Sequence, residues 1–274
     1  MWQMGRIGGY HLSADAQKAV YGVTYYSVEK NKSRAVIYSS TPTTDAAPVA
    51  LTADGSAEYA PSFIPGTDKV AYLAADADGA MQLWMMNAAG TSRKQISFEA
   101  TDVNDYLFSP CGKKVILVKT ITHEKSVQQN DADLQLTTGI VANDLIYKHW
   151  DHYTTSAPHP FVADFDGNKV SESKDLLEGE PYECPMLPFG GVEQLAWNPN
   201  GKQIAYTCRK KSGLDYAIST NSDIYLYDIA TGTHTNLTEG NMGYDTNPSY
   251  SPDGQWIAWQ SMERDGYESD ENRL

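Results

Sequence analysis

The stretch Pro248-Ser249-Tyr250-Ser251-Pro252-Asp253-Gly254 is followed closely by the apolar run Trp256-Ile257-Ala258-Trp259. Three earlier stretches have the same order of a strand, a proline–glycine turn and a second, apolar strand, and they lie at residues 61–73, 106–118 and 195–207. A unit of this kind that recurs along a chain is typical of a β-propeller, whose four-stranded blades take about 40–50 residues each. The repeat therefore predicts an all-β fold built from stacked blades.

The spacing of the repeat indicates where the chain carries extra sequence. The second prolines of the four copies are Pro65, Pro110, Pro199 and Pro252, so the steps between them are 45, 89 and 53 residues. Since a blade takes about 40–50 residues, the long step contains either two blades or one blade with an insertion. We favour the single blade, because residues 161–165 have the pattern of its third strand.

The blades are expected at residues of about 7–52, 53–97, 98–179, 190–238 and 243–274. The third blade has an insertion at residues 123–159, whose middle, residues 138–150, has apolar side chains at helical spacing and predicts a short helix. The last blade stops after two strands, which makes about four and a half blades. Because a propeller closes with about four to eight blades, we expect an incomplete propeller from a longer protein.

One unit is preserved well enough to predict its individual strands. They are expected at residues 194–197, 203–208, 223–228 and 235–238. The second of them is apolar at nearly every position, which indicates that neighbouring blades cover both of its faces. A single blade cannot bury both faces, so the hydrophobic core forms only where blades stack.

The charge balance restricts the partners. The 274 residues include 21 Lys and Arg against 35 Asp and Glu, a formal net charge of −14, so neither nucleic acid nor an anionic membrane is an expected partner. No stretch approaches the roughly 18 apolar residues that cross a bilayer. Residues 1–6 lack the pattern of a signal peptide. We expect a periplasmic or secreted protein whose leader was removed or lay upstream, and a cytoplasmic location stays open.

Neither a metal nor a cofactor is expected. The cysteines Cys111, Cys184 and Cys208 lack the spacing of a metal site, and their odd number argues against a complete disulfide framework. One bridge between two of them stays open if the protein is exported. His149 and His152 have the spacing of two ligands on one helical turn, but the sequence offers no evident third ligand.

Four further stretches are more specific than the turns. They are Leu145-Ile146-Tyr147-Lys148-His149-Trp150-Asp151-His152, His159-Pro160-Phe161-Val162-Ala163-Asp164, Ser219-Thr220-Asn221-Ser222-Asp223-Ile224-Tyr225 and Ser261-Met262-Glu263-Arg264-Asp265-Gly266-Tyr267-Glu268. Together they resemble the N-terminal propeller of the prolyl oligopeptidase family, in its bacterial branch of dipeptidyl peptidases and acylaminoacyl peptidases. The resemblance covers essentially the whole chain.

The resemblance implies a propeller of seven or eight blades that covers a C-terminal α/β-hydrolase domain and admits short peptides to a Ser-Asp-His triad. The chain has no G-x-S-x-G sequence, which such hydrolases use to expose the serine. We therefore expect no catalytic residue in this chain, no peptidase activity from it alone, and a hydrolase domain as its partner. The open edges of an incomplete ring also predict self-association or a partner chain.

Most of the candidate binding residues lie in the insertion. The resemblance implies that this insertion faces the active-site cavity, where Asp144 or Asp151 binds the terminal ammonium of a peptide and Tyr147 or Trp150 packs against a peptide side chain. The alternative is that the two aromatic residues attach the expected helix to its blade while the aspartates are solvated.

A second group of candidates lies in residues 262–267, which are expected to join strands two and three of the last blade. Its charged residues either line the same cavity or form a solvated loop with an internal ion pair. The full set of candidate substrate-binding residues is Asp144, Tyr147, His149, Trp150, Asp151, Glu263 and Arg264.

Besides the peptidase propeller, a propeller fold is compatible with two other functions. The alternative is a stand-alone propeller of the TolB type that binds a protein or a carbohydrate. A propeller glycosidase would need two carboxylates on inner strands, about 5 Å or 6.5–9.5 Å apart, and no such pair is evident in the sequence. The gene beyond Leu274 distinguishes the peptidase propeller from the stand-alone propeller, because a hydrolase domain follows only in the peptidase.

Overall fold

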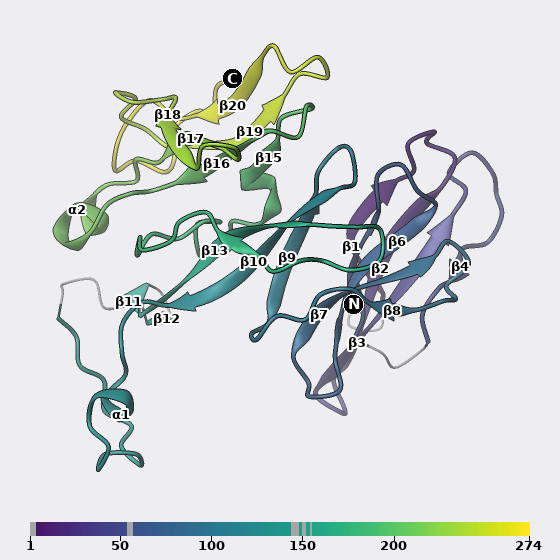
Figure 1. Ribbon diagram of the computed structural model, residues 1–274, viewed down its shortest axis with the longest axis horizontal. Coiled ribbons are helices and arrows are strands. Elements are labelled where there is room, and N and C mark those ends of the chain that lie inside the picture. Colours follow the sequence, from purple (N-terminus) through teal and green to yellow (C-terminus); the bar gives the residue numbers. More distant parts are fainter. Residues whose placement is uncertain (1–3, 54–56, 144–147, 150–151, 154) are drawn as a thin grey trace. The chain divides into compact units, whose positions relative to one another are not determined.

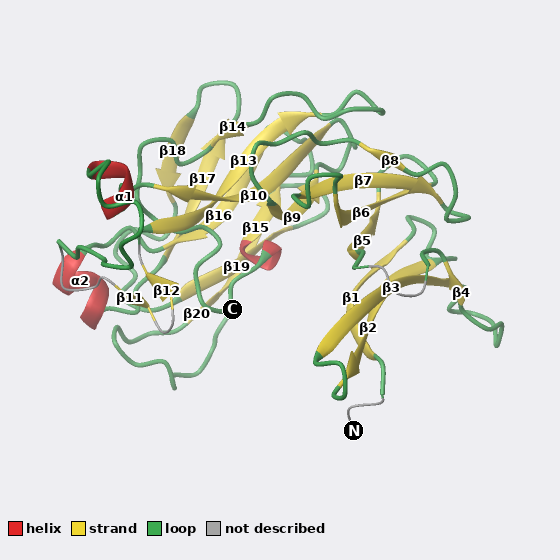
Figure 2. Cartoon of the chain, turned by 90° about the horizontal axis from the view of Figure 1, so that it is seen from below, coloured by secondary structure: helices red, strands yellow, loops and turns green. Residues whose placement is uncertain are grey.

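The computed structural model describes residues 4–53, 57–143, 148–149, 152–153 and 155–274. Antiparallel sheets make up most of the regular secondary structure of this described part, and its helices are short (Figures 1 and 2). The chain forms two compact units. Unit 1 contains residues 1–117 and 163–173, and unit 2 contains residues 118–162 and 174–274.

Two four-stranded sheets belong wholly to unit 1. The first contains β1 (Arg6–Leu12), β2 (Ala19–Ser27), β3 (Lys32–Ser40) and β4 (Val49–Ala50), in that order. The second contains β5 (Tyr59–Phe63), β6 (Lys69–Ala75), β7 (Met81–Asn87) and β8 (Lys94–Gln95). In both sheets each strand pairs antiparallel with the next strand along the chain, so both are simple meanders.

A third sheet has the same order but a long connection in its middle. Its strands are β9 (Val103–Phe108), β10 (Lys114–Thr122), β13 (Ser156–Asp164) and β14 (Lys174–Asp175). The division between the two units passes through β10 and β13. Residues 123–155 therefore leave the sheet after its second strand and return to it at its third.

Unit 2 contains a further complete meander and a two-stranded sheet. The meander consists of β15 (Leu195–Trp197), β16 (Gln203–Cys208), β17 (Asp223–Asp228) and β18 (Thr233–Asn236). The 3-10 helix η1 (Val192–Gln194) precedes it, and α2 (Gly213–Ile218) lies between its second and third strands. The two-stranded sheet pairs β19 (Asp245–Tyr250) with β20 (Ile257–Ser261).

The second strand of a meander carries the core. Strands β6, β10 and β16 are each buried over five consecutive residues. Burial of every residue, rather than every other one, requires a neighbour on both faces of the sheet. The continuous apolar pattern of these strands therefore reflects stacking between sheets, as the sequence predicts.

The recurring turns depend on glycine. Gly66, Gly112, Gly201 and Gly254 have φ angles of 75°, 66°, 69° and 69°. A residue with a Cβ atom is strained at such angles, whereas glycine adopts them freely. This backbone requirement explains why the same turn residues recur.

The insertion differs from its sequence-based prediction. Residues 138–143 have no regular secondary structure, and β11 (Lys148–His149) pairs with β12 (His152–Tyr153) as a short hairpin, so the helix expected over residues 138–150 is wrong where the structure describes it. The insertion's helix is α1 (Val127–Asn130). A capping box between Ser126 and Gln129 begins this helix. The Thr-Gly-Ile-Val run at residues 138–141 has poor helix formers, which outweigh the spacing of its apolar residues.

The all-β prediction and the presence of a short helix within the insertion are both confirmed. Among the described residues, none of the helices has the length and apolar character needed to cross a membrane.

Candidate functional site on the connector face of unit 2

The topology of a meander sorts its connections into two groups. Connections between the second and third strands, and those from a fourth strand to the next sheet, leave at one edge, while the tight turns leave at the opposite edge. In unit 2 the first group consists of residues 123–155, 176–194, 209–222, 237–244 and 262–272. We call the surface that they form the connector face. The hairpin β11–β12 and helix α2 lie close to each other in both views (Figures 1 and 2).

Two charged residues meet on this face from different connections. Arg209 directly follows β16, and its Nη2 atom lies 3.6 Å from Oε1 of Glu183. Each of these residues is only 9% exposed. The hydroxyl of Tyr216, on α2, donates to the same Oε1 atom at 2.8 Å, and the guanidinium carbon lies 4.3 Å from the centre of the tyrosine ring. The aromatic ring thus holds both members of the ion pair.

One donor of Arg209 has no acceptor among the described residues. The Nη1 atom donates to the carbonyl oxygen of Ser219 at 3.4 Å, whereas the Nε atom is buried without a hydrogen-bond partner in the part of the chain that the structure describes. A buried donor without an acceptor costs about 1–3 kcal/mol.

The charge and hydrogen bonding of the pair define what it can bind. Burial raises the pKa of Tyr216, and the neighbouring carboxylate of Glu183 raises it further. Tyr216 is therefore a neutral donor at physiological pH. A carboxylate beside an arginine suits a ligand with a cationic group and a neutral carbonyl oxygen close together, rather than a simple anion.

The backbone around Glu183 is anchored on both sides. The thiol of Cys208 donates to its carbonyl oxygen at 3.5 Å, and the amide of Cys184 donates to the carbonyl oxygen of Pro158 at 2.8 Å. Nearby, Lys210 and Glu180 form a second ion pair with Nζ and Oε2 2.6 Å apart. The carboxylate of Glu183 is thus presented from a rigid segment.

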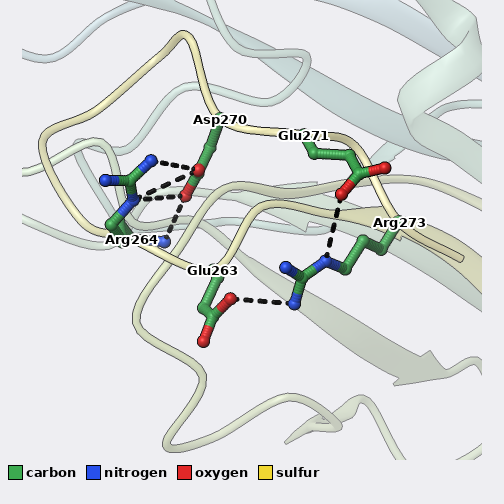
Figure 3. A network of polar contacts seen from close by, with 5 residues as sticks. All are labelled: Glu263, Arg264, Asp270, Glu271 and Arg273. Atoms are coloured by element: carbon green, nitrogen blue, oxygen red, sulfur yellow. Dashed lines mark hydrogen bonds and ion pairs between the residues drawn. The ribbon is translucent and has the colours of Figure 1, made fainter.

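The candidates Glu263 and Arg264 lie in a neighbouring connection of the same face and form ion pairs with residues a few positions further along the chain (Figure 3). The Nη2 atom of Arg264 lies 2.6 Å from Oδ1 of Asp270, and its guanidinium carbon lies 4.2 Å from the ring centre of Tyr267. Glu263 pairs with Arg273 at 2.8 Å. This arrangement favours the interpretation of a solvated loop with internal ion pairs over a binding role.

The other candidates fall in the insertion. Asp144, Tyr147, Trp150 and Asp151 lie outside the described residues. The backbone of His149 in β11 pairs with that of His152 in β12, so the two residues lie on paired strands instead of on one helical turn. The metal site considered from the sequence has these two histidines on one helical turn, and the hairpin shows that this helical turn is absent at His149 and His152.

Sequence reasoning missed Glu183, Arg209 and Tyr216. The only sequence signal is the position of Arg209, a charged residue that ends the apolar run of β16. Glu183 and Tyr216 lie in connections without any periodic pattern, so their meeting with Arg209 is visible only in the folded chain.

Comparison with known proteins identifies relatives over nearly the whole chain. No family model matches the chain. Dipeptidyl-peptidase 5 of Porphyromonas endodontalis is 44% identical over 271 residues, which cover 99% of this chain and 39% of the relative. Dipeptidyl-peptidase 5 of Porphyromonas gingivalis is 43% identical over 271 residues, with the same shares. The chain therefore spans 39% of the length of these curated relatives.

Solved structures share the fold at low sequence identity. The acylaminoacyl peptidase of Pyrococcus horikoshii has a TM-score of 0.68 and 16% identity, over 99% of this chain and 38% of that one. TolB from Acinetobacter baumannii has a TM-score of 0.52 and 20% identity, over 98% of this chain and 56% of that one. The stacked meanders and these neighbours define the chain as part of a β-propeller.

The sequence relatives then give the family. The chain belongs to the prolyl oligopeptidase family and corresponds to a portion of its propeller. Within that family, the dipeptidyl-peptidases 5 of the two Porphyromonas species are relatives over nearly its whole length.

Proposed function

We propose that this chain is the substrate-gating propeller portion of a serine exopeptidase that cleaves short peptides. The observation that carries the proposal is the 44% identity to a dipeptidyl-peptidase 5 over 99% of the chain. The chain itself has no G-x-S-x-G sequence, so the nucleophile would come from an α/β-hydrolase domain elsewhere in the protein. The greater length of the relatives supports such a partner domain.

The pair Glu183–Arg209 is suited to the N-terminal end of a peptide. An unblocked peptide has an ammonium group next to its first carbonyl oxygen. In the proposed complex Glu183 accepts from the ammonium and the guanidinium of Arg209 donates to the carbonyl oxygen. Tyr216 keeps its hydrogen bond to the carboxylate throughout. The insertion residues Asp144 and Asp151 stay predicted ligands for the same ammonium group.

The test uses the full-length protein and a panel of dipeptidyl-aminomethylcoumarin substrates, each with a free or an acetylated N-terminus. We expect cleavage of the free form alone. Glu183→Gln keeps the shape and the bond from Tyr216 but removes the charge, and Arg209→Lys keeps the charge but removes Nε. Because a charged hydrogen bond contributes about 1.5–3 kcal/mol, each change should raise KM about 10- to 100-fold with little change in kcat.

Asp215→Asn is the matched control, because it removes an exposed acid from the same helix, α2. It should leave KM unchanged. The proposed site is wrong if Glu183→Gln behaves like this control in a variant with wild-type thermal unfolding. The proposed activity is wrong if the full-length protein releases no dipeptide.

A stand-alone binding propeller is the second candidate, supported by the fold likeness to TolB. That likeness is weaker than the one to the acylaminoacyl peptidase, with TM-scores of 0.52 and 0.68. An open reading frame that ends without a hydrolase domain would favour this candidate.

Three further expectations belong to the proposal. A bacterial origin is supported by the Porphyromonas relatives. A periplasmic or secreted location is tested by fractionating cells and probing for the full-length protein. Self-association through open sheet edges is tested by light scattering of the isolated chain, where a monomer at all concentrations would contradict it.

A further inference from the structure

Asp265 ties together two connections that belong to successive sheets of unit 2. It lies after β20, yet its carboxylate accepts from the chain segment that follows α2. The hydroxyl of Ser219 donates to its two oxygens at 2.8 and 2.9 Å, and the amides of Thr220 and Asn221 donate at 2.8 and 3.1 Å. The amide of Gly266 donates back to the hydroxyl of Thr220 at 2.9 Å. Hydrogen bonds thus run in both directions between the two connections.

Helix α2 depends on such ties because core packing does not hold it. None of its residues is buried, and it is only six residues long. A helix this short is unstable by itself, so its position must come from its attachments. At its C-terminal end the attachment is Asp265, and elsewhere it is the contact of Tyr216 with Glu183 and Arg209.

The tie leads directly to the candidate binding site. Ser219, whose hydroxyl is bound by Asp265, uses its carbonyl oxygen to accept from Nη1 of Arg209. Tyr216, three residues before Ser219, has its ring against the same guanidinium. A shift of residues 219–221 would move both contacts and with them the guanidinium of Arg209.

We propose that Asp265 is a positioning residue for the peptide-binding pair Glu183–Arg209, acting through Ser219 and the end of α2. The inference rests on the proposed function, because it concerns the same site. Burial raises the pKa of Asp265, but the bonds from Ser219, Thr220 and Asn221 outweigh it and lower the pKa overall. The carboxylate that makes the tie is therefore ionised at neutral pH.

The experiment measures KM and kcat of the full-length protein with a dipeptidyl-aminomethylcoumarin substrate. Asp265→Ala should raise KM about 5- to 20-fold while kcat stays within about twofold, the pattern of lost ground-state binding. Asp265→Asn keeps one acceptor oxygen and should raise KM less. Asp270→Asn is the matched control, because Asp270 lies in the same connection but bonds back to Arg264 within it. It should leave KM unchanged.

Combination with Arg209→Lys separates positioning from general stability. If Asp265 acts through Arg209, Asp265→Ala should add little to KM in the Arg209→Lys background, since residues that act as a unit are not additive. Full additivity, or a lower melting temperature with unchanged KM, would overturn the inference. Should Asp265→Ala fail to fold, the comparison of Asp265→Asn with Asp270→Asn decides in the same way.

Failure of the inference is distinct from failure of the proposed function. If Arg209→Lys raises KM and the Asp265 variants do not, the site stands and the positioning role is wrong. If Arg209→Lys leaves KM unchanged, the binding site itself is wrong and the role of Asp265 falls with it.

Discussion

The hydroxyl of Tyr106 lies 2.6 Å from the carbonyl oxygen of Ala60. Tyr106 is on β9 and Ala60 is on β5, so a strand of the third sheet satisfies a backbone group of the sheet before it, and both residues belong to unit 1. Ala60 has a φ angle of 51°, and the register of β5 shifts between Tyr59 and Ser62. A bulge of this kind leaves a backbone group unpaired in the ladder. The tyrosine hydroxyl fills that gap and is also 2.8 Å from the carbonyl oxygen of Ala71.

The first prediction concerns this contact. Tyr106→Phe should lower the free energy of unfolding by about 1–3 kcal/mol, because the single O–H donor shared by the carbonyl oxygens of Ala60 and Ala71 is lost and the hydroxyl of Ser62 loses an acceptor. Urea unfolding followed by circular dichroism measures the change. Tyr10→Phe is the control, since Tyr10 is 73% exposed on β1, and it should change stability by less than about 0.5 kcal/mol. Equal effects of the two changes would contradict the prediction.

A second prediction compares two glycines of the repeated turn. A Cβ atom at Gly112 would lie 2.3 Å from the carbonyl oxygen of Pro65, whereas one at Gly66 would meet nothing within 4 Å. Both have positive φ angles, so each Ala variant costs about 1–2 kcal/mol of backbone strain. Gly112→Ala should cost about 1–3 kcal/mol more, because it also forces two turns apart. Chemical denaturation of both variants tests this, and similar midpoints would refute the close approach.

The third prediction concerns the cysteines, all three of which are free thiols in the structure. Cys111 is exposed, and its hydrogen bond with Ser109 is the main cause that lowers its pKa. Burial raises the pKa of Cys184 and Cys208. A thiol reagent such as dithionitrobenzoate should therefore label one cysteine in the native chain and three after denaturation. Cys111→Ser should abolish native labelling, and persistent labelling of that variant would show that a buried thiol is accessible.

The fourth prediction is a pH dependence. Hydrogen bonds from Arg264 are the main cause that lowers the pKa of Asp270 to about 2. An unfolded aspartate titrates near pH 3.9, so the pair stabilises the folded loop above about pH 4, and this contribution is lost as the pH falls towards 2. Carbon-13 NMR of the Asp270 carboxyl group gives the pKa directly. In Arg264→Gln the carboxyl group should titrate at higher pH, and an unchanged midpoint would contradict the pairing.

Strand positions were predictable where an uninterrupted apolar run lies between two turns. Strands β16 and β17 lie at residues 203–208 and 223–228, as expected. The outer strand β18 lies at Thr233–Asn236 instead of residues 235–238, because a polar outer strand has no apolar pattern to locate it. The helix expected over residues 138–150 was wrong at its described residues, 138–143 and 148–149, because helical spacing of a few apolar residues does not overcome poor helix formers.

The ion pair Glu183–Arg209 could not be found from the sequence. Glu183 and Arg209 lie in two separate connections, and neither connection has a repeat or a motif. Their contact exists because antiparallel meanders bring alternate connections to the same edge of stacked sheets. Which residues of these connections contact each other is decided only when the sheets have packed.

The amino-acid sequence by itself determined the class of fold and the family. A turn with positive φ requires glycine, and a strand covered on both faces requires apolar residues. Both features can therefore be recognised in the local sequence. Only the tertiary structure decided which side chains share a site. Glu183, Arg209, Tyr216 and Asp265 come together through hydrogen bonds and ion pairs between loops, and such contacts depend on how the sheets stack rather than on any pattern along the chain.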